Sequence, residues 1–382
     1  MEATTKGRET HWRNWCSYVA PLGVDPTLQD TDFQKGQRLL TGFGGLNRTG
    51  YYGRGGKVQG GTVSSSITAV GTAISVACDL NPTKKRGSEK MLSRIQEMLD
   101  GFAKEDPPTM KKLPVEVNVP ELLGEMSRRD GASELDKAVA DSVLIAFYYL
   151  LRVGEYTVKG KRNNSKQTQQ FKLKDVTFFK RNAKGQLRQL GRNATDAEIM
   201  TADSATLKLD NQKNGWKGVC VNQEANGDTH DCPVRALARR FCSIQKRSTN
   251  SNTFLSAYWV NNTRHDVSDE DIRGSLKLAA RVLDYPAAKG IPIDHIDTHS
   301  LRSGGANALS LSGYSDRQIQ KMGRWKGATF KEYIREELAC CSEGMSKSMK
   351  RKFGFVNIAG SAYSNVTDTV MTMEYDSVAT MA

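Results

Sequence analysis

The apolar run at residues 143–151 is the feature that most limits what this chain can fold into. It belongs to a strongly apolar helix that hydrophobic spacing predicts over residues 135–151. A helix that crosses a bilayer needs about 20 apolar residues, and this run has about half of that length. The run is therefore expected in the core of a soluble domain, and we expect no membrane association.

The composition agrees with a soluble protein. The 382 residues are 38% hydrophobic and 25% charged, with a mean hydropathy of −0.54. These values exclude a collagen, a coiled-coil rod and a wholly disordered chain, and the length leaves room for two or three domains. The first residues do not form a secretory signal, so we expect the protein to be intracellular. The seven cysteines are scattered and contain no C-x-x-C pair, which predicts reduced, mostly buried thiols.

The charge of the chain points to its partner. There are 55 Lys and Arg against 42 Asp and Glu, which gives a formal net charge of +13 and a pI of about 9.3. Residues 358–382 hold three acidic side chains and no basic one, so the positive charge lies in the rest of the chain. A basic body with a weakly acidic tail favours a polyanion as the partner.

The first hundred residues have the pattern of a small helical domain. Apolar spacing predicts helices at residues 8–19, around residues 33–40, at residues 63–80, and at a fourth stretch that Ser88 caps and that contains residues 91–99. Residues 42–61 hold nine glycines and are predicted to form a loop. We therefore expect a helical domain over residues 1–103 and, because prolines follow, an extended linker over residues 104–117.

A mixed pattern follows over residues 118–337, which are predicted to form a second domain. The sequence predicts helices at 119–128, 135–151, 233–242 and, with glycine breaks, 268–337, and strands at 171–178 and 205–210. Asn214-Gly215 lies between two strand-like runs and predicts a β-hairpin, because both residues tolerate the positive φ of a type I′ turn. The fold class expected is mostly α with a small antiparallel β-sheet.

The segment 297–307 contains the most informative side chains. Thr298 or Asp297 can cap a helix whose first turn holds His299 and Arg302, three residues apart and so on one face. The helix N-terminus adds a partial positive charge, and two glycines at 304–305 let another backbone or a ligand approach closely. The segment predicts a seat for an oxyanion or a phosphate. The alternative is a capped core helix with one surface arginine.

Two aromatic residues further along add to this pattern. Trp325 lies in Gly323-Arg324-Trp325, and Tyr333 follows eight residues later, where Gly327 is expected to separate it from the preceding helix. Aromatic residues in such places are often plain core residues. In the same way, an arginine at the end of an apolar helix, such as Arg152, is often only a cap.

Taken together, these side chains resemble the tyrosine recombinase (phage integrase) family in their order and approximate spacing. The match is Arg152-Val153-Gly154-Glu155, Lys213 at the hairpin, His299-x-x-Arg302, Gly323-Arg324-Trp325 and Tyr333. It covers residues 118–337, and the Gly-Arg-Trp form is most similar to integrases of eukaryotic mobile elements such as Crypton and DIRS-like transposons. The resemblance implies a helical N-terminal core-binding domain over residues 1–103 and an α+β tyrosine recombinase catalytic domain over residues 118–337.

The resemblance also implies the catalytic roles. Arg152 and Arg302 would clamp the oxygens of one phosphate, because planar guanidinium groups match its geometry. His299 would add a hydrogen bond and help to move the nucleophile's proton. Trp325 would replace the second histidine of many relatives, with an indole N–H that can only donate. Tyr333 would attack phosphorus and form a 3′-phosphotyrosyl link to DNA, leaving a free 5′-hydroxyl.

The general acid is left open between two lysines. Lys213 at the hairpin is the residue that the family's pattern favours, and Lys217 just beyond the turn is the rival. A solvated hairpin lysine is the plain alternative for both. Glu155 is implied as a supporting residue that orients the cations. No cofactor and no metal is required.

The implied partner is double-stranded DNA, which a homo-tetramer would bind at paired sites. Residues 338–382 would form a C-terminal tail, with a helix at 338–357 lent to a neighbouring subunit and disorder at 358–382. The protein would be nuclear if the host is eukaryotic. Two other functions stay open, namely a catalytically silent domesticated DNA-binding protein and a topoisomerase IB-like enzyme that nicks and relaxes DNA.

Overall fold

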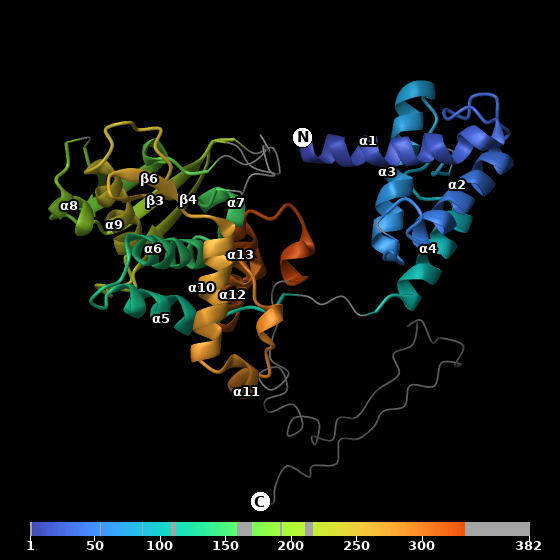
Figure 1. The fold of residues 1–382 in the computed structure, drawn as a ribbon. Coiled ribbons are helices and arrows are strands. Elements are labelled where there is room, and N and C mark those ends of the chain that lie inside the picture. The colour runs from blue at the N-terminus through green and yellow to red at the C-terminus, as the bar shows by residue number, and fades with distance from the viewer. Residues whose placement is uncertain are drawn as a thin grey trace, which may run out of the picture. The chain divides into compact units, whose positions relative to one another are not determined.

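The computed structural model describes residues 2–53, 55–85, 87–107, 112–158, 170–191, 193–210 and 217–332 (Figure 1). Helices make up most of the described elements, and the strands form one four-stranded and one two-stranded antiparallel sheet. The predicted fold class, mostly α with a small antiparallel β-sheet, is confirmed. The buried side chains form one cluster within residues 15–99 and others within residues 115–330.

Four helices form the first part of the chain, as the sequence predicts. They are α1 (Glu2–Val19), α2 (Phe33–Arg48), α3 (Gly60–Cys78) and α4 (Ser93–Glu105), and a short 3-10 turn, η1 (Ala20–Leu22), follows α1. Their core contains Trp15, Leu40, Phe43, Ile67 and Ile95, each fully buried. By length and composition α3 is apolar enough to cross a membrane, but here Val63, Ile67, Val70 and Ile74 place one face of it in this core.

Two details of this part differ from prediction. The glycine-rich stretch 42–61 is not one loop, because α2 continues to Arg48 and α3 already begins at Gly60. Gly44 is needed in α2 for packing, since a Cβ there would lie 2.7 Å from the Met98 Cε atom. Ser88 does not cap α4, which begins at Ser93, and instead its hydroxyl accepts from the Lys90 amide in a turn.

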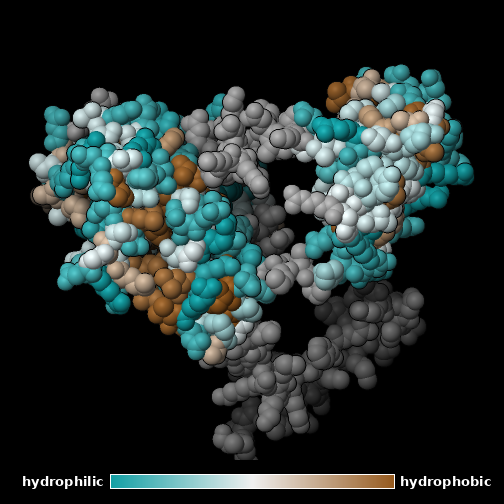
Figure 2. Space-filling view, in the orientation of Figure 1, coloured by the Kyte–Doolittle hydropathy of each residue, from teal (hydrophilic) through white to brown (hydrophobic). Residues whose placement is uncertain are grey.

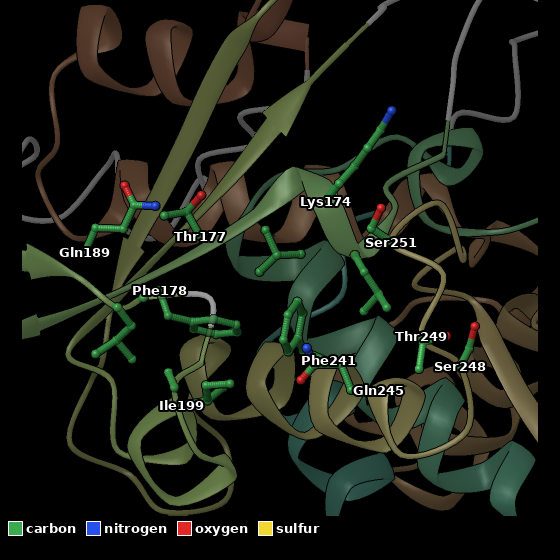
Figure 3. A pocket seen from close by; sticks show the side chains of 15 residues that line it. Lys174, Thr177, Phe178, Gln189, Ile199, Phe241, Gln245, Ser248, Thr249 and Ser251 are labelled. Atoms are coloured by element: carbon green, nitrogen blue, oxygen red, sulfur yellow. The ribbon is translucent and has the colours of Figure 1, made fainter.

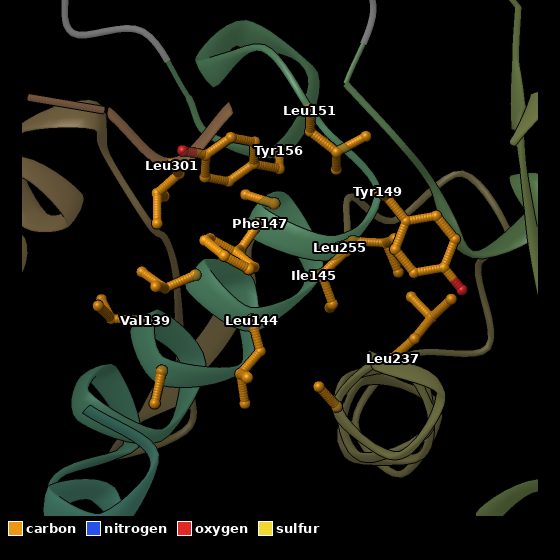
Figure 4. Close-up of a cluster of buried hydrophobic side chains, with 14 of the residues drawn as sticks. Val139, Leu144, Ile145, Phe147, Tyr149, Leu151, Tyr156, Leu237, Leu255 and Leu301 are labelled. Atoms are coloured by element: carbon orange, nitrogen blue, oxygen red, sulfur yellow. The ribbon is translucent and has the colours of Figure 1, made fainter. Parts of the chain in front are cut away.

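The apolar helix at the centre of the second part is α6 (Glu134–Tyr148). All residues from Ala138 to Phe147 are buried, and the helix contacts α5 (Asn118–Ser127), α9 (Pro233–Gln245), α10 (Asp269–Val282) and α12 (His299–Leu311). Figure 4 shows Leu144, Ile145 and Phe147 of this helix among Leu237 of α9 and Leu301 of α12. The prediction that residues 143–151 form a buried core is confirmed.

The remaining elements of this part are short. They are α7 (Val153–Tyr156), η2 (Leu173–Asp175), α8 (Asp196–Met200), α11 (Tyr285–Lys289), η3 (Ile293–His295), α13 (Asp316–Gly323) and η4 (Ala328–Glu332). The surface in Figure 2 is mainly hydrophilic, with a hydrophobic patch over α5 and α10, where Leu278 and Val282 are exposed. Among the five cysteines that the structure describes, none is paired, and Cys232 and Cys242 are buried.

The larger sheet has the strand order β2-β1-β3-β4. Its strands are β1 (Val176–Arg181), β2 (Leu187–Gln189), β3 (Ser204–Leu209) and β4 (Val219–Glu224). β3 and β4 pair antiparallel with Leu209 opposite Val219, so the hairpin predicted around Asn214-Gly215 is present, although residues 211–216 lie outside the described range. A second hairpin, β5 (Ala257–Val260) and β6 (Thr263–Asp266), was not predicted.

The segment 112–117, within the predicted linker, lies along the start of α12. The Leu113 amide donates to the His295 carbonyl (2.9 Å) and the Val115 amide donates to the Ser300 carbonyl (3.2 Å). Val115 is buried, and its carbonyl lies so close to Gly304 that a Cβ atom there would collide with it. Gly304 therefore serves the close approach of another backbone, one of the two possibilities that the sequence raised.

Candidate active site

The start of α12 is held by a network around Asp297. The Thr298 amide donates to Asp297 Oδ1 (2.6 Å), the Asp297 amide donates to Ser300 Oγ (3.1 Å), and Arg273 Nε donates to Asp297 Oδ1 (3.2 Å). Of the two residues predicted as the cap, Thr298 occupies the cap position but makes no side-chain cap bond, whereas the carboxylate of Asp297 accepts from the Thr298 amide. The Asp297 carboxylate and the Ser300 hydroxyl therefore hold the turn that carries His299.

Arg302 joins three distant pieces of chain. Its guanidinium donates to the carbonyl of Leu150, after α6, and to the carbonyl of Gly323, at the end of α13. Its Cζ atom lies 4.3 Å from the centre of the Trp325 ring, a distance at which a cation and an aromatic face attract each other. Arg302 is only 1% exposed, so these contacts fix its position from inside the protein.

Trp325 is a core residue as well as a site residue. It is 7% exposed and packs with Leu150, Ala306, Ile319 and Phe330. A Cβ atom at Gly323 would collide with the Trp325 ring, so glycine at this position allows the ring to fold back onto the end of α13. The packing holds the indole against the guanidinium of Arg302.

A buried carboxylate, Glu155, lies between two arginines. Its Oε2 atom accepts from the Arg152 amide and from Arg324 Nη2, both at 2.9 Å, and its Oε1 atom lies 3.3 Å from Arg152 Nη1. Glu155 is fully buried, Arg324 is 1% exposed, and the side chain of Arg152 is 23% exposed. Arg152 is thus the member of the group that faces solvent.

His299 is exposed and lies in the electrostatic field of both predicted phosphate-binding arginines. Partial burial lowers its pKa below the ordinary value of 6.5, and the nearby charges of Arg302 and Arg152 lower it further, while Asp297 acts in the opposite direction. The neutral imidazole is therefore favoured near neutral pH, and a neutral imidazole can accept a proton.

The structure brings together four of the six side chains predicted to be catalytic. These are Arg152, His299, Arg302 and Trp325, with the supporting residue Glu155 beside them. Lys213 and Tyr333 lie outside the described residues. Lys217 is exposed and directly precedes Gly218, whose amide donates to the Leu209 carbonyl at the turn end of the β3–β4 hairpin (2.7 Å). Arg324 was not predicted as a separate site residue, although it stands inside the Gly-Arg-Trp motif.

The cations and the helix end suit an anion. Arg152 and His299 reach solvent, Arg302 lies behind them, and the N-terminus of the 13-residue helix α12 adds the partial positive charge of the helix dipole. Glu155, the carboxylate in contact with these cations, is enclosed by two arginines and does not meet solvent. The carboxylate of Asp297, at the start of the same helix, is partly exposed and is bound to Arg273.

A cavity lies away from these residues. It has a volume of about 730 Å³ and is lined by Thr177, Phe178, Gln189, Ile199 and Phe241 among others (Figure 3). None of the predicted site residues lines it. Within the described ranges, no group of three or more His, Cys, Asp and Glu side chains could hold a metal ion.

Comparisons with known proteins give structural similarities only. A scan of protein-family models gives no match, and a search of curated proteins gives none. The chain is similar to the Tn1549 transposon integrase in complex with circular intermediate DNA, with 12% identity over 84% of this chain and 85% of that chain and a TM-score of 0.42. It is also similar to XerA recombinase, with 14% identity over 92% of this chain and 94% of that chain and a TM-score of 0.36. Similarities of this size do not establish function, which has to rest on the side chains of the site.

Proposed function

We propose that this protein is a tyrosine recombinase, an integrase that cuts and rejoins DNA through a 3′-phosphotyrosyl intermediate. The observation that carries the proposal is the convergence of Arg152, His299, Arg302 and Trp325, which come from three separate regions of the chain, at one helix N-terminus. Two guanidinium groups, an imidazole and the positive end of a helix dipole in one place form a suitable seat for the phosphodiester of DNA.

In this proposal the chain's own residues supply the whole reaction. Tyrosine has a pKa of about 10 and is a weak nucleophile at neutral pH, so the phosphate must be made electrophilic by cations. Arg152, whose side chain reaches solvent, binds the phosphate oxygens, and Arg302, buried behind it against Trp325, adds its positive charge to stabilise the same oxygens from inside the site. The Tyr333 oxygen attacks phosphorus while its proton passes to His299, whose lowered pKa keeps it ready to accept one.

The leaving group is the 5′-oxygen of the DNA strand. When the bond from phosphorus to this oxygen breaks, Lys213 or Lys217 donates a proton and a 5′-hydroxyl is formed. The phosphotyrosyl bond then stores the energy for rejoining, so a second DNA end can reverse the reaction without ATP. Glu155 keeps Arg152 oriented through its contacts with the backbone amide and the guanidinium.

The wider assembly follows from the same proposal. Residues 1–103 act as a core-binding domain on double-stranded DNA, residues 104–117 as the linker, residues 118–337 as the catalytic domain and residues 338–382 as a tail that contacts a neighbouring subunit. A homo-tetramer acts on paired DNA sites, and the protein is intracellular and nuclear in a eukaryotic host. The net charge of +13 leads us to expect DNA affinity that falls steeply with salt.

The proposal is tested with nicked suicide substrates made from the DNA that flanks the gene. The full-length protein should form an adduct that survives a denaturing gel, and Tyr333→Phe should form none. Tyr314→Phe is the matched control, because Tyr314 is half exposed and lies outside the site, so its adduct should equal that of the wild type. Arg152→Ala should lower the rate of adduct formation by about 10²–10³-fold, as the loss of one transition-state donor does.

The other outcomes separate the two alternatives. If the wild type binds these duplexes and forms no adduct on any of them, the protein is a silent DNA-binding protein. If it forms the adduct and relaxes DNA as a monomer without exchanging strands between paired sites, it is a topoisomerase IB-like enzyme.

A further inference from the structure

Arg324 is a buried cation to which the proposed chemistry gives no task. It directly follows the last residue of α13, it is 1% exposed, and it adopts the left-handed conformation with φ of 58°. Left-handed backbone is uncommon for residues other than glycine and is kept where the surroundings require it. The burial and the left-handed backbone of Arg324, next to Trp325, therefore require a physical explanation.

We infer that Arg324 is a positioning residue that neutralises Glu155 and thereby leaves Arg152 free to bind phosphate. The inference deepens the proposed function and rests on it for the identity of the phosphate. Arg324 does not reach solvent, so it acts through Glu155 and through the Leu150 carbonyl rather than on the DNA itself.

The contacts of Arg324 connect both predicted phosphate-binding arginines. Its Nη2 atom donates to Glu155 Oε2 (2.9 Å) and to the Leu150 carbonyl (3.1 Å). Glu155 also binds Arg152, and the Leu150 carbonyl also accepts from Arg302. The Arg324 guanidinium therefore binds the Glu155 carboxylate, which also binds Arg152, and the Leu150 carbonyl, which also binds Arg302. Through these contacts it connects the chain after α6 with α7, α12 and α13.

The charge balance explains why a second arginine is needed. Glu155 is fully buried, and a buried carboxylate is strongly unfavourable unless cations and hydrogen bonds compensate it. With Arg324 in place, Arg152 contributes one guanidinium contact of 3.3 Å and keeps part of its side chain at the surface. Without Arg324, Glu155 would keep Arg152 as its guanidinium partner within the described part of the chain. The guanidinium of Arg152 would then be drawn toward Glu155, inward and away from the phosphate.

The expected consequence is a loss of rate without a loss of DNA affinity. Arg324→Gln should slow adduct formation by about 100-fold, the cost of a donor displaced by about 1 Å. The affinity for DNA, which many other cations support, should stay close to that of the wild type. Arg324→Lys keeps the charge and should recover part of the rate. Arg317→Gln, a change at an exposed arginine on the same helix α13, is the matched control and should change neither quantity.

A second measurement tests the inference without relying on catalysis. Phenylglyoxal modifies accessible arginines, and peptide mass spectrometry of the full-length protein gives the rate at Arg152. This rate should fall several-fold in Arg324→Gln and return to at least the wild-type rate in the double variant Arg324→Gln/Glu155→Gln, where no buried carboxylate draws Arg152 inward. Circular dichroism reports whether each variant is folded.

The outcomes are distinguishable. A wild type that forms no adduct contradicts the proposed function, while the labelling rates still decide the inference. If Arg152 is labelled at the wild-type rate in folded Arg324→Gln, Arg324 does not position it and the inference is wrong. If Arg324→Gln does not fold, the double variant decides, because slow labelling of Arg152 in it would also contradict the inference.

Discussion

Gly305 offers a direct test of how closely α12 packs on the central helix α6. A Cβ atom at this position would collide with the Phe147 carbonyl oxygen and would lie 2.5 Å from Leu150 Cδ2. The first of these neighbours is backbone and cannot rotate away. Gly305→Ala should therefore force α12, which carries His299 and Arg302, away from the end of α6.

The size of the effect follows from a comparison with a second glycine. Gly274 lies in α10, is exposed, and has nothing within 4 Å of the place where a Cβ atom would be. In both helices alanine gains about 0.5–1 kcal/mol over glycine from the smaller loss of backbone entropy. Only Gly305→Ala also meets the cost of overpacking, about 1–3 kcal/mol, so this cost is the difference between the two variants.

The assay is urea unfolding of the full-length variants, followed by far-UV circular dichroism. With an m-value of about 3 kcal/mol/M, the midpoint of the transition that unfolds α6 and α12 should lie about 0.3–1 M lower in Gly305→Ala than in Gly274→Ala. Gly274→Ala itself should lie at or above the wild type. A rise of the midpoint in both variants would refute the close contact between α12 and α6.

Four further predictions concern the pKa of His299, the pH dependence of stability, a helix cap and a buried arginine. Asp297→Asn should lower the pKa of His299 further in an NMR titration, because the Asp297 carboxylate raises it. Because the folded-state pKa of His299 lies below 6.5, the contribution of His299 to stability should fall as the pH drops below 6.5 and level off below the folded-state pKa. Denaturation of the wild type and of His299→Gln at several pH values would measure this contribution. Ser268→Ala should lower the free energy of unfolding by about 1 kcal/mol, since it removes the Oγ atom that accepts from the Asp271 amide at the start of α10, and thermal melts would measure this. Arg48→Met should lower the melting temperature of the first part more than Lys57→Met, because Arg48 is buried and bound to Asp106 whereas Lys57 is exposed.

The sequence predicts those elements whose signals are local. The apolar helix α6 and the β3–β4 hairpin were found because hydrophobic spacing and an Asn-Gly turn act over a few residues. The β5–β6 hairpin also has a local sequence signal, the pair Asn261-Asn262, that was not used to predict it. Asparagine tolerates positive φ, and both residues adopt it in this turn.

The elements that were predicted wrongly depend on distant contacts. Gly44 lies within α2 because glycine lets Met98 of α4 approach the helix, and no pattern around residue 44 indicates this packing. Arg324 was missed because its burial depends on Glu155, 169 positions earlier in the chain. The grouping of Arg152, His299, Arg302 and Trp325 was predictable only through the resemblance to a family, because spacing alone does not bring these residues together.

The bond between Val115 and Ser300 gives the chain an inbuilt mechanical linkage. The Val115 amide donates to the carbonyl of Ser300 in the first turn of α12, and the Leu113 amide donates to the carbonyl of His295 just before that helix. A displacement of the backbone at residues 113–115 therefore acts within one helical turn of His299 and Arg302.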